Sequence, residues 1–533
     1  MKAAVYNRWL HQRGGGERHA AMAAAVLARR FDDTRLITHR WIAREELESA
    51  LNIDLSTVRI EVIPALPANR FAEFTAQFDL FVNASFMTSQ PSAARRSMLL
   101  VLFPSPIDRS WIGQVRRNVG RFLTHQLLLP QWIDGFYDVQ ELGRGWFRYA
   151  TDRALVRLPV LPLRRTSVVV EIIAGNFHAK RPLPVRCIVN GEHVAERTFS
   201  PRPGDFERWP VRVPRSLVTN GVLDISLESP TYNPAHEHGG SDNREVGLAV
   251  TDVRVRDPRR LIYEVLFRRL FRELGLRLEG LPEYGSLDFL AGYDVIAPIS
   301  EFSRRWMNHY WDRNGPLLFP PVDTSWALPG ARRPAIIAVG RFFRGTHEKK
   351  HGVMIDEFIR MRREGLDGWT LHLVGQQSQR DIDREYTREL QQQAVGQPIE
   401  FHIDATFQEL QRLYGEARIY WHAAGHGEHA SRNPVRFEHF GITVVEAMAS
   451  GTVPVAIDRG GLPEIITHGV DGFRWSTTRE LREYTWSLIR DGDLWTRMSE
   501  ASHLASQRFN VAAFTKCLNG LVDDLGFQTV SGT

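Results

Sequence analysis

Residues 438–451 read EHFGITVVEAMASG, and this stretch organises the C-terminal half of the chain. Its two glutamates, Glu438 and Glu446, flank His-Phe-Gly and the start of an apolar run that predicts a helix. VPVAI at residues 453–457 follows as a short buried strand. Paired glycines at residues 460–461 then lead into Leu-Pro-Glu, which opens another helix.

The position of the two carboxylates has a chemical use. A helix that begins directly after a glycine loop directs free backbone N–H groups and the positive end of its dipole toward a ligand, which suits a phosphate. Glu446 falls in the first turns of this helix, where it can accept hydrogen bonds from the vicinal hydroxyls of a ribose. Glu438 precedes the loop and can hold other hydroxyls. The stretch therefore predicts a site for a phosphorylated polyol.

Length and composition limit the class of protein. The chain has 533 residues, which is too long for one core and predicts about three domains. Hydrophobic residues make up 43% and charged residues 24%, as in globular proteins, and no apolar run is long enough to span a membrane. The first ten residues lack a signal-peptide pattern. Two distant cysteines, Cys187 and Cys517, predict neither a disulfide framework nor a zinc site and favour a reducing cytoplasm.

The charge balance is modestly basic. The formal net charge is +5 and the pI is near 9.3. Such an excess suits the phosphates of a ligand or an anionic membrane surface. No recognition motif supports nucleic acid as a partner.

The N-terminal part alternates strands and helices. An apolar strand at residues 3–6 leads into a three-glycine loop with Gly15 and Gly16, then an alanine-rich helix at residues 20–30. Strand, glycine loop and helix form the first unit of a nucleotide-binding fold. The loop lacks a dinucleotide fingerprint, so it does not predict NAD, and a flexible turn is the alternative interpretation. RIEVIP, FDLFVNAS and MLLVLFPSP predict further parallel strands, the last of which ends at Phe103.

Between residues 151 and 257 the helical periodicity disappears. Six short strand patterns follow one another, separated by turn residues: SVVVEIIA, LPVRCIVNG, HVAERTF, RWPVRVP, VLDISLES and VGLAVTDVRV. This series of short strands and turns predicts an inserted β-sandwich. Sugar binding or acceptor guidance fits such an insert, and so does a spacer or oligomerisation role. His236 and His238 in its polar loop fit a metal site, but a solvated loop is the favoured interpretation.

A basic amphipathic segment, DPRRLIYEVLFRRLFRELGLRLEG, occupies residues 257–280. Its apolar residues recur at helical spacing, and arginines crowd the remaining positions. Such a helix can lie on an anionic bilayer. The favoured interpretation is a helix that packs in the N-terminal domain with its arginines solvated.

The C-terminal half has the clearest pattern. AIIAVG, TLHLVG, IEFHI, RIYWHA and VPVAI are strands that alternate with helices, which predicts a doubly wound parallel sheet. Arg341 follows AIIAVG at its carboxyl end, where such sheets bind ligands, and Lys349 begins the next helix, with Lys350 as its close alternative. Asp381 and Asp383 have the spacing of a metal-binding pair, but the charged helical pattern around them predicts solvated carboxylates.

These features together resemble the retaining family 4 glycosyltransferases, which have the GT-B fold. The resemblance extends over about residues 335–509, with shorter pieces near the N-terminus. It implies two Rossmann-like α/β domains facing a cleft, with the β-sandwich inserted in the N-terminal half. The expected boundaries are residues 1–150 for the first part of the N-terminal domain, 151–257 for the insert, 258–328 for the second part and linker, and 329–533 for the C-terminal nucleotide-sugar-binding domain.

The resemblance also implies the roles of the site residues. Glu438 would hold the donor sugar, and Glu446 the ribose. The family pattern places an arginine and a lysine on the diphosphate, which implies the remaining catalytic residues, Arg341 and Lys349. Backbone groups that contact the phosphates or the sugar are expected at Gly441, Gly15 and Gly16. The family works without a metal, so neither a metal nor a cofactor is expected.

The expected function is transfer of a sugar from a nucleotide diphosphate sugar to a glycan or lipid-linked acceptor in cell-surface polysaccharide or glycolipid synthesis. GGGER, PPVD and EHFG favour GDP-mannose, as in mannosyltransferases of lipid-linked oligosaccharides, and UDP-sugars stay open. The alternatives are a carbohydrate-binding or scaffold protein on a degenerate fold, and a phosphorylase or epimerase, although no pyridoxal lysine context is seen. The expected location is the cytoplasm, with contact at the inner face of the cell membrane as an option.

Overall fold

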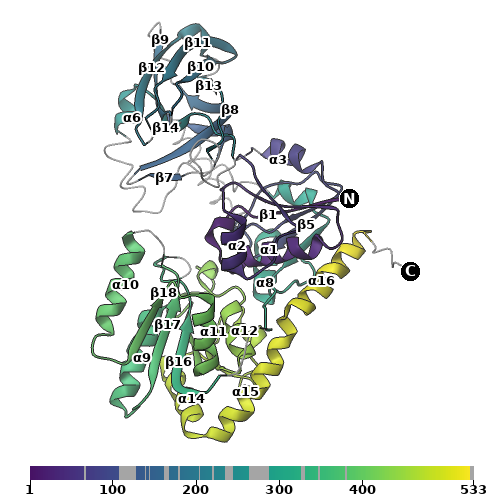
Figure 1. Ribbon diagram of the computed structural model, residues 1–533, viewed down its shortest axis with the longest axis vertical. Coiled ribbons are helices and arrows are strands. Elements are labelled where there is room, and N and C mark those ends of the chain that lie inside the picture. Colours follow the sequence, from purple (N-terminus) through teal and green to yellow (C-terminus); the bar gives the residue numbers. More distant parts are fainter. Residues whose placement is uncertain are drawn as a thin grey trace. The chain divides into compact units, whose positions relative to one another are not determined.

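The structure is a computed structural model. It describes residues 1–64, 66, 68–106, 128–137, 140–142, 145–160, 167–177, 180–202, 204–218, 221–234, 244–262, 287–325, 330–345, 348–377 and 381–527. The chain divides into two compact units (Figure 1). The first consists of Met1–Leu99 and Ser105–Asp294, and the second of Leu100–Pro104 and Val295–Thr533.

The first parallel sheet begins at the N-terminus. Its strands are β1 (Lys2–Tyr6), β2 (Asp33–Thr38), β3 (Arg59–Val62), β4 (Leu80–Asn83), β5 (Arg96–Val101) and β15 (Val295–Pro298), in the order β15-β5-β4-β1-β2-β3. The helices between them are α1 (Gly15–Leu27), α2 (Arg44–Leu51) and α3 (Ala68–Thr75). Strand order reverses beside β1, which is where sheets of this kind open to ligands. The predicted strand and helix at the N-terminus are confirmed as β1 and α1, but α1 already begins at Gly15, so the predicted loop residues Gly15 and Gly16 belong to the helix.

A nine-stranded antiparallel sheet covers the described part of the predicted insert and also includes strands that precede it. Its strands are β6 (Gln131–Phe136), β7 (Gln140–Leu142), β8 (Gly145–Pro159), β9 (Ser167–Gly175), β10 (Leu183–Val189), β11 (Glu192–Phe199), β12 (Glu207–Pro214), β13 (Val222–Glu228) and β14 (Ala249–Val255). Buried and exposed residues alternate along β10 and β12, as expected for strands with one face on a core. The antiparallel strands are confirmed, and their packing as a β-sandwich stays a prediction.

The antiparallel strands begin earlier than the predicted insert. β6 starts at Gln131, and the expected boundary at residue 151 falls inside the fifteen-residue strand β8. The sequence of β8 mixes glycine, aromatic and charged residues, so the apolar alternation that indicates a strand is weak in its first half. After β14, α6 (Pro258–Ile262) opens the basic segment. The rest of that segment, and His236 and His238, lie outside the described residues.

The second parallel sheet confirms the predicted doubly wound arrangement. Its strands are β16 (Arg333–Val339), β17 (Thr370–Gly375), β18 (Ile399–Ile403), β19 (Ala417–His422), β20 (Val453–Ile457) and β21 (Phe473–Trp475), in the order β18-β17-β16-β19-β20-β21. All five pairings are parallel. The order reverses between β16 and β19, so the loops that follow these two strands flank the switch point where such sheets bind ligands.

Helices surround this sheet and continue to the C-terminus (Figure 1). They are α9 (His351–Arg363), α10 (Asp381–Gln393), α11 (Phe407–Glu416), α12 (Ile442–Ala449), α13 (Leu462–Ile465), α14 (Thr478–Arg490), α15 (Gly492–Ser506) and α16 (Val511–Asp524). The helix α8 (Glu301–Trp311) instead follows β15 of the first sheet and contacts it. None of the helices in the described ranges is both long enough and apolar enough to cross a membrane.

Candidate functional site

A three-residue polar cluster lies at the switch point of the second sheet. Lys349 lies two residues before the start of α9, His422 ends β19, and Glu438 lies in the loop before α12. The Lys349 Nζ is 2.5 Å from Glu438 Oε2, and His422 Nε2 is 3.1 Å from the same oxygen. The side chains of Lys349 and Glu438 are about four-fifths buried, with 22% and 18% exposed, and His422 is buried. The fold thus brings the predicted Glu438 and Lys349 into direct contact.

The protonation states in this cluster follow from its contacts. Burial by itself would raise the pKa of Glu438, but the charge of Lys349 and the hydrogen bond with His422 outweigh it and hold the pKa well below its ordinary value. Burial lowers the pKa of His422, although Glu438 acts in the opposite direction. Glu438 is therefore a carboxylate and His422 a neutral imidazole at pH 7. Because a carboxylate only accepts hydrogen bonds, His422 Nε2 carries the proton and donates it to Glu438.

A glycine makes room for the lysine. A Cβ atom added to Gly340, the residue after β16, would lie 2.5 Å from Cγ of Lys349. The lysine stem therefore passes close over the backbone at the end of β16 and reaches Glu438 only because residue 340 has no side chain. The next residue, Arg341, is exposed, and its guanidinium lies 6.0 Å from the ring centroid of Phe343. Among the described residues no carboxylate forms an ion pair with Arg341.

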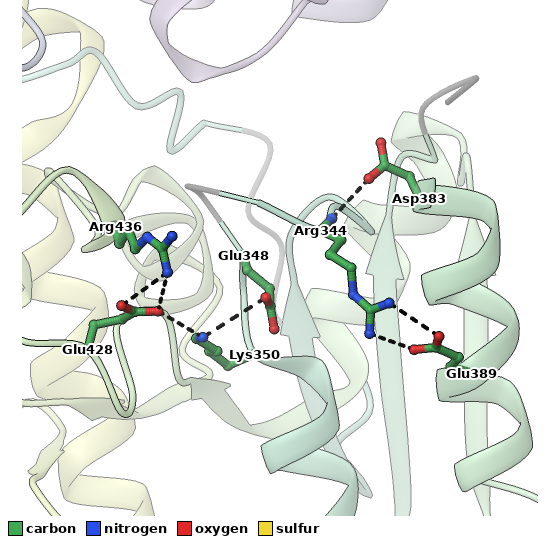
Figure 2. A network of polar contacts seen from close by, with 7 residues as sticks. All are labelled: Arg344, Glu348, Lys350, Asp383, Glu389, Glu428 and Arg436. Atoms are coloured by element: carbon green, nitrogen blue, oxygen red, sulfur yellow. Dashed lines mark hydrogen bonds and ion pairs between the residues drawn. The ribbon is translucent and has the colours of Figure 1, made fainter. Parts of the chain in front are cut away.

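The alternative lysine has different partners. Figure 2 shows Lys350 between Glu428 and Glu348, with its Nζ 3.1 Å and 4.0 Å from their carboxylate oxygens. Arg436 contacts the same Glu428 carboxylate at 3.2 Å. Burial would raise the pKa of Glu428, but the hydrogen bonds from Lys350 and Arg436 lower it. Lys350 thus belongs to a separate ion-pair network, and Lys349 is the lysine that contacts Glu438.

The prediction of solvated carboxylates at residues 381 and 383 is wrong for Asp383. Asp383 is completely buried, and its Oδ1 accepts a hydrogen bond from the backbone N–H of Arg344 at 2.9 Å (Figure 2). The carboxylate anchors the loop after β16, which explains its burial in a helix of otherwise charged residues. The Arg344 guanidinium in turn pairs with Glu389 at 2.7 Å. The side chain of Asp381 lies outside the described residues.

Glu446 lies in the second turn of α12, and 6% of it is exposed. The Tyr414 hydroxyl donates to its Oε2 at 3.3 Å. The helix begins after Gly441, whose φ of +120° is outside the range of residues with a side chain. A Cβ there would also lie 2.7 Å from Leu462. The glycine therefore lets the chain turn sharply into α12.

The paired glycines at residues 460–461 hold the Glu438 backbone. A Cβ on Gly460 would lie 2.2 Å from the Glu438 carbonyl oxygen, and the Gly461 N–H donates to this oxygen at 2.8 Å. The next residue, His439, is held on two sides, since its carbonyl accepts from the Ser300 hydroxyl at 2.6 Å and its ring stacks on Phe103 at 4.4 Å. The loop that carries Glu438 is thus anchored by hydrogen bonds to its backbone and by stacking of the His439 ring.

Sequence reasoning missed His422. Its signal was present, because RIYWHA ends with a histidine at the carboxyl end of a strand beside the switch point. The other two predicted site residues, Gly15 and Gly16, belong to the first unit and form the first turn of α1. The N–H of the preceding Gly14 donates to Glu17 Oε2 at 2.8 Å, which caps this helix.

Comparison with known proteins connects the second unit to a family. Residues 333–491 match Glycosyl transferases group 1. The chain is 28% identical over 217 residues to the GDP-Man:Man(3)GlcNAc(2)-PP-Dol alpha-1,2-mannosyltransferase of Dictyostelium discoideum, which covers 37% of this chain and 40% of that protein. It is 34% identical over 171 residues to the Mus musculus protein of the same name, with coverages of 28% and 31%. The chain thus spans 40% or less of the length of these relatives.

A solved structure extends the likeness to the whole chain. Anabaena Alr3699/HepE in complex with UDP and glucose aligns with a TM-score of 0.51 over 98% of this chain and 100% of that chain, at 12% identity. At this identity the likeness concerns the fold alone, and it agrees with the two parallel α/β sheets described above. Residues 333–491 match the Glycosyl transferases group 1 family. This segment carries Arg341, Lys349, His422, Glu438 and Glu446.

Proposed function

We propose that this protein is a retaining glycosyltransferase that moves a sugar from a nucleotide diphosphate sugar to a glycan or lipid-linked acceptor in cell-surface polysaccharide or glycolipid synthesis. The observation that carries the proposal is the contact of Lys349 and His422 with Glu438 at the switch point of a sheet that matches Glycosyl transferases group 1. Mannose from GDP-mannose is the favoured donor, because the mannosyltransferases named above are similar to 28–37% of this chain. UDP-sugars remain the alternative.

The proposed donor site uses the charges of the second unit. Arg341 is exposed beside the switch point, and Lys349 presents an ammonium group that Glu438 holds in place. The diphosphate of the donor would contact Lys349, in addition to Glu438, and would form an ion pair with Arg341. Glu446 would accept hydrogen bonds from the ribose. The positive end of α12 would add to this field. These groups supply the positive charge that a diphosphate needs, so we propose that the transfer needs no metal at this site.

The proposed reaction is a front-face displacement. The bond between the anomeric carbon and the phosphate oxygen breaks, and its electron pair stays on the leaving diphosphate. The acceptor hydroxyl attacks the anomeric carbon from the same face, and its proton passes to the leaving phosphate oxygen. Arg341 and Lys349 stabilise the negative charge that grows on the diphosphate. Glu438 faces the sugar and stabilises the positive charge that develops at the anomeric centre.

Calorimetry and turnover test the proposal. GDP or UDP should bind in the presence of a chelator, and the nucleotide sugar should be consumed with release of the nucleotide diphosphate. Replacing Lys349 with Ala should weaken nucleotide binding roughly tenfold or more, because a hydrogen bond to a charged group contributes about 1.5–3 kcal/mol. Lys350→Ala is the matched control and should change it far less, since Lys350 pairs with Glu428. A protein that binds glycans but no nucleotide would instead be the scaffold alternative.

The remaining parts of the proposal concern the acceptor. We propose that the antiparallel sheet is a β-sandwich that guides the glycan or lipid-linked acceptor. The proposed location is the cytoplasm, with contact at the inner face of the cell membrane as an option.

A further inference from the structure

Two histidines and a glutamate share one face at the edge of the second sheet. His372 lies on β17, and Glu400 and His402 lie on the edge strand β18. The parallel register pairs His372 with Glu400, and side chains two residues apart on a strand point to the same face. The three side chains therefore converge on one point. Figure 1 labels β17 and β18 side by side in the second unit.

The donor atoms have the spacing of a metal site. His372 Nδ1 lies 3.1 Å from His402 Nε2 and 3.4 Å from Glu400 Oε2, and His402 Nε2 lies 3.6 Å from the same Oε2. Zinc binds nitrogen and oxygen at about 2.0–2.2 Å, and a tetrahedron of that size separates its ligands by about 3.3–3.6 Å. The three measured separations fall close to this range, so one ion could contact all three atoms with little movement.

A second carboxylate fixes the histidine in the required form. His402 Nδ1 lies 2.7 Å from Oε1 of Glu409 on α11. A carboxylate accepts this proton, so the lone pair of His402 lies on Nε2, the atom that faces His372 and Glu400. A ligating histidine in metal sites commonly donates its other N–H to a carboxylate in this way. The histidine side chains are 15% and 13% exposed and Glu400 is 59% exposed, so the cluster is open to solvent on the Glu400 side.

We propose that His372, Glu400 and His402 bind a Zn²⁺ ion, with water in the fourth position and Glu409 as the orienting partner of His402. Two imidazoles and one carboxylate are the donor set that suits this ion. The ion would tie the edge strand β18 to β17, and Glu409 would connect it to α11. It would stabilise the second unit, and it is separate from the cluster of Lys349, His422 and Glu438 in its residues and its chemistry.

Metal titration of the full chain tests the site. The protein is first freed of metal with a chelator and then titrated with Zn²⁺ in a calorimeter, and with Co²⁺ while visible absorption is recorded. We expect one tight Zn²⁺ site, a rise in the thermal unfolding midpoint with Zn²⁺, and the intense absorption of tetrahedral Co²⁺. His402→Ala should lose the Co²⁺ spectrum and bind Zn²⁺ at least about a hundredfold more weakly.

Two further variants separate coordination from a structural role. Glu409→Gln keeps the shape but weakens the orienting hydrogen bond, and should reduce Zn²⁺ affinity roughly 10–100-fold while keeping the tetrahedral spectrum. His309→Ala removes an exposed histidine on α8 and should change nothing. The proposal is overturned if the wild type gives no tetrahedral Co²⁺ spectrum, or if His402→Ala binds Zn²⁺ as tightly as His309→Ala. Thermal unfolding without metal shows whether each variant is folded.

Discussion

At the scale of single residues, the two glutamates of the opening motif differ in their surroundings. Glu438 contacts the Lys349 ammonium group and the neutral His422 imidazole at the switch point of the second sheet. Glu446 is buried in α12 beside the Tyr414 hydroxyl. Ribose hydroxyls do not change during the reaction, so a residue that holds them acts equally on the ground state and the transition state. A residue that faces the anomeric carbon acts mainly on the transition state.

Substituting each glutamate with glutamine should separate these roles. Glu446→Gln should raise the donor KM with little change in kcat. Glu438→Gln should lower kcat by about a hundredfold to a thousandfold, the usual effect of one electrostatic contact in a transition state, while free nucleotide diphosphate still binds. Steady-state kinetics and calorimetry on both variants measure these effects. If Glu438→Gln abolishes nucleotide binding and Glu446→Gln leaves it intact, the two roles are reversed.

Gly340 offers a test of the lysine that leaves its charge unchanged. In Gly340→Ala the new methyl group would clash with Cγ of Lys349 and displace the ammonium from Glu438. The φ of Gly340 is not in the left-handed region, so the backbone itself tolerates alanine. We expect nucleotide affinity to fall roughly tenfold or more, since a charge-assisted contact is lost.

Gly352→Ala is the matched control for this substitution. Gly352 lies in α9, and a Cβ there meets no atom closer than 3.4 Å. This variant should bind the nucleotide normally and be more stable by about 0.5–1 kcal/mol, because alanine is the better helix former. Equal affinities for the two variants would show that the position of Lys349 does not affect nucleotide binding.

At the scale of elements, two helix N-termini are capped by carboxylates in contrasting environments. Both Glu464 oxygens accept backbone N–H groups of α8 at 2.6 Å, and burial raises the pKa of Glu464 to about 6. Glu480 accepts two N–H groups at the start of α14 at 2.7 and 3.1 Å, and its exposed position lets these bonds lower its pKa. Burial therefore decides the sign of the shift.

The two caps should respond to pH in opposite directions. The raised pKa of Glu464 means that its contribution to stability is complete below pH 4.5 and is lost as pH rises through 6. The unfolding midpoint of the wild type relative to Glu464→Gln should therefore increase as pH falls from 7 to 4.5. The difference in unfolding midpoint between the wild type and Glu480→Gln should stay constant as the pH falls to about 5 and should decrease below pH 4.5. Thermal unfolding measured across this pH range tests the opposite pH dependence of the two caps. Parallel trends in both variants would contradict it.

Much of the element pattern could be predicted from the sequence, and the exceptions have physical causes. Strands of a parallel sheet are covered on both faces, so β16 and β20 appear as unbroken apolar runs. The strands β6 and β7 and the three-residue β21 lack such a pattern, and they were not predicted. The burial of Asp383 was also missed, because it depends on a backbone N–H 39 residues away in the chain.

The sequence indicated two members of the polar cluster, Lys349 and Glu438, but not their contacts, and the roles of these residues in donor binding stay a prediction. Residue types and their order in the chain indicated Arg341, Lys349 and Glu438. The contact of His422 with Glu438, and the choice between Lys349 and Lys350, depend on which way each side chain turns at the end of a strand. The metal cluster depends on the register of β17 and β18, which pairs residues 28 positions apart in the sequence.

At the scale of the whole molecule, the donor site and the antiparallel sheet belong to different units. The residues proposed to bind the donor nucleotide, from Arg341 to Glu446, lie in the second unit, whereas β6 to β14 lie in the first. The core of the antiparallel sheet is formed almost entirely by its own strands, with Trp209 and Phe199 among its largest members. A sheet with its own core can be removed with less damage to the rest of the chain than a strand of a shared core.

Replacing residues 131–257 with a short glycine-serine linker tests the role of this sheet. We expect the deletion variant to bind GDP or UDP with unchanged affinity, because every proposed contact to the nucleotide in the second unit is retained. Transfer to the natural acceptor should be lost, while slow hydrolysis of the donor continues. Calorimetry and a nucleotide-dependent rise in the unfolding midpoint show that the donor site is folded. Full activity on the acceptor would remove the sheet from acceptor recognition, and loss of nucleotide binding would mean that the second unit depends on it for its structure.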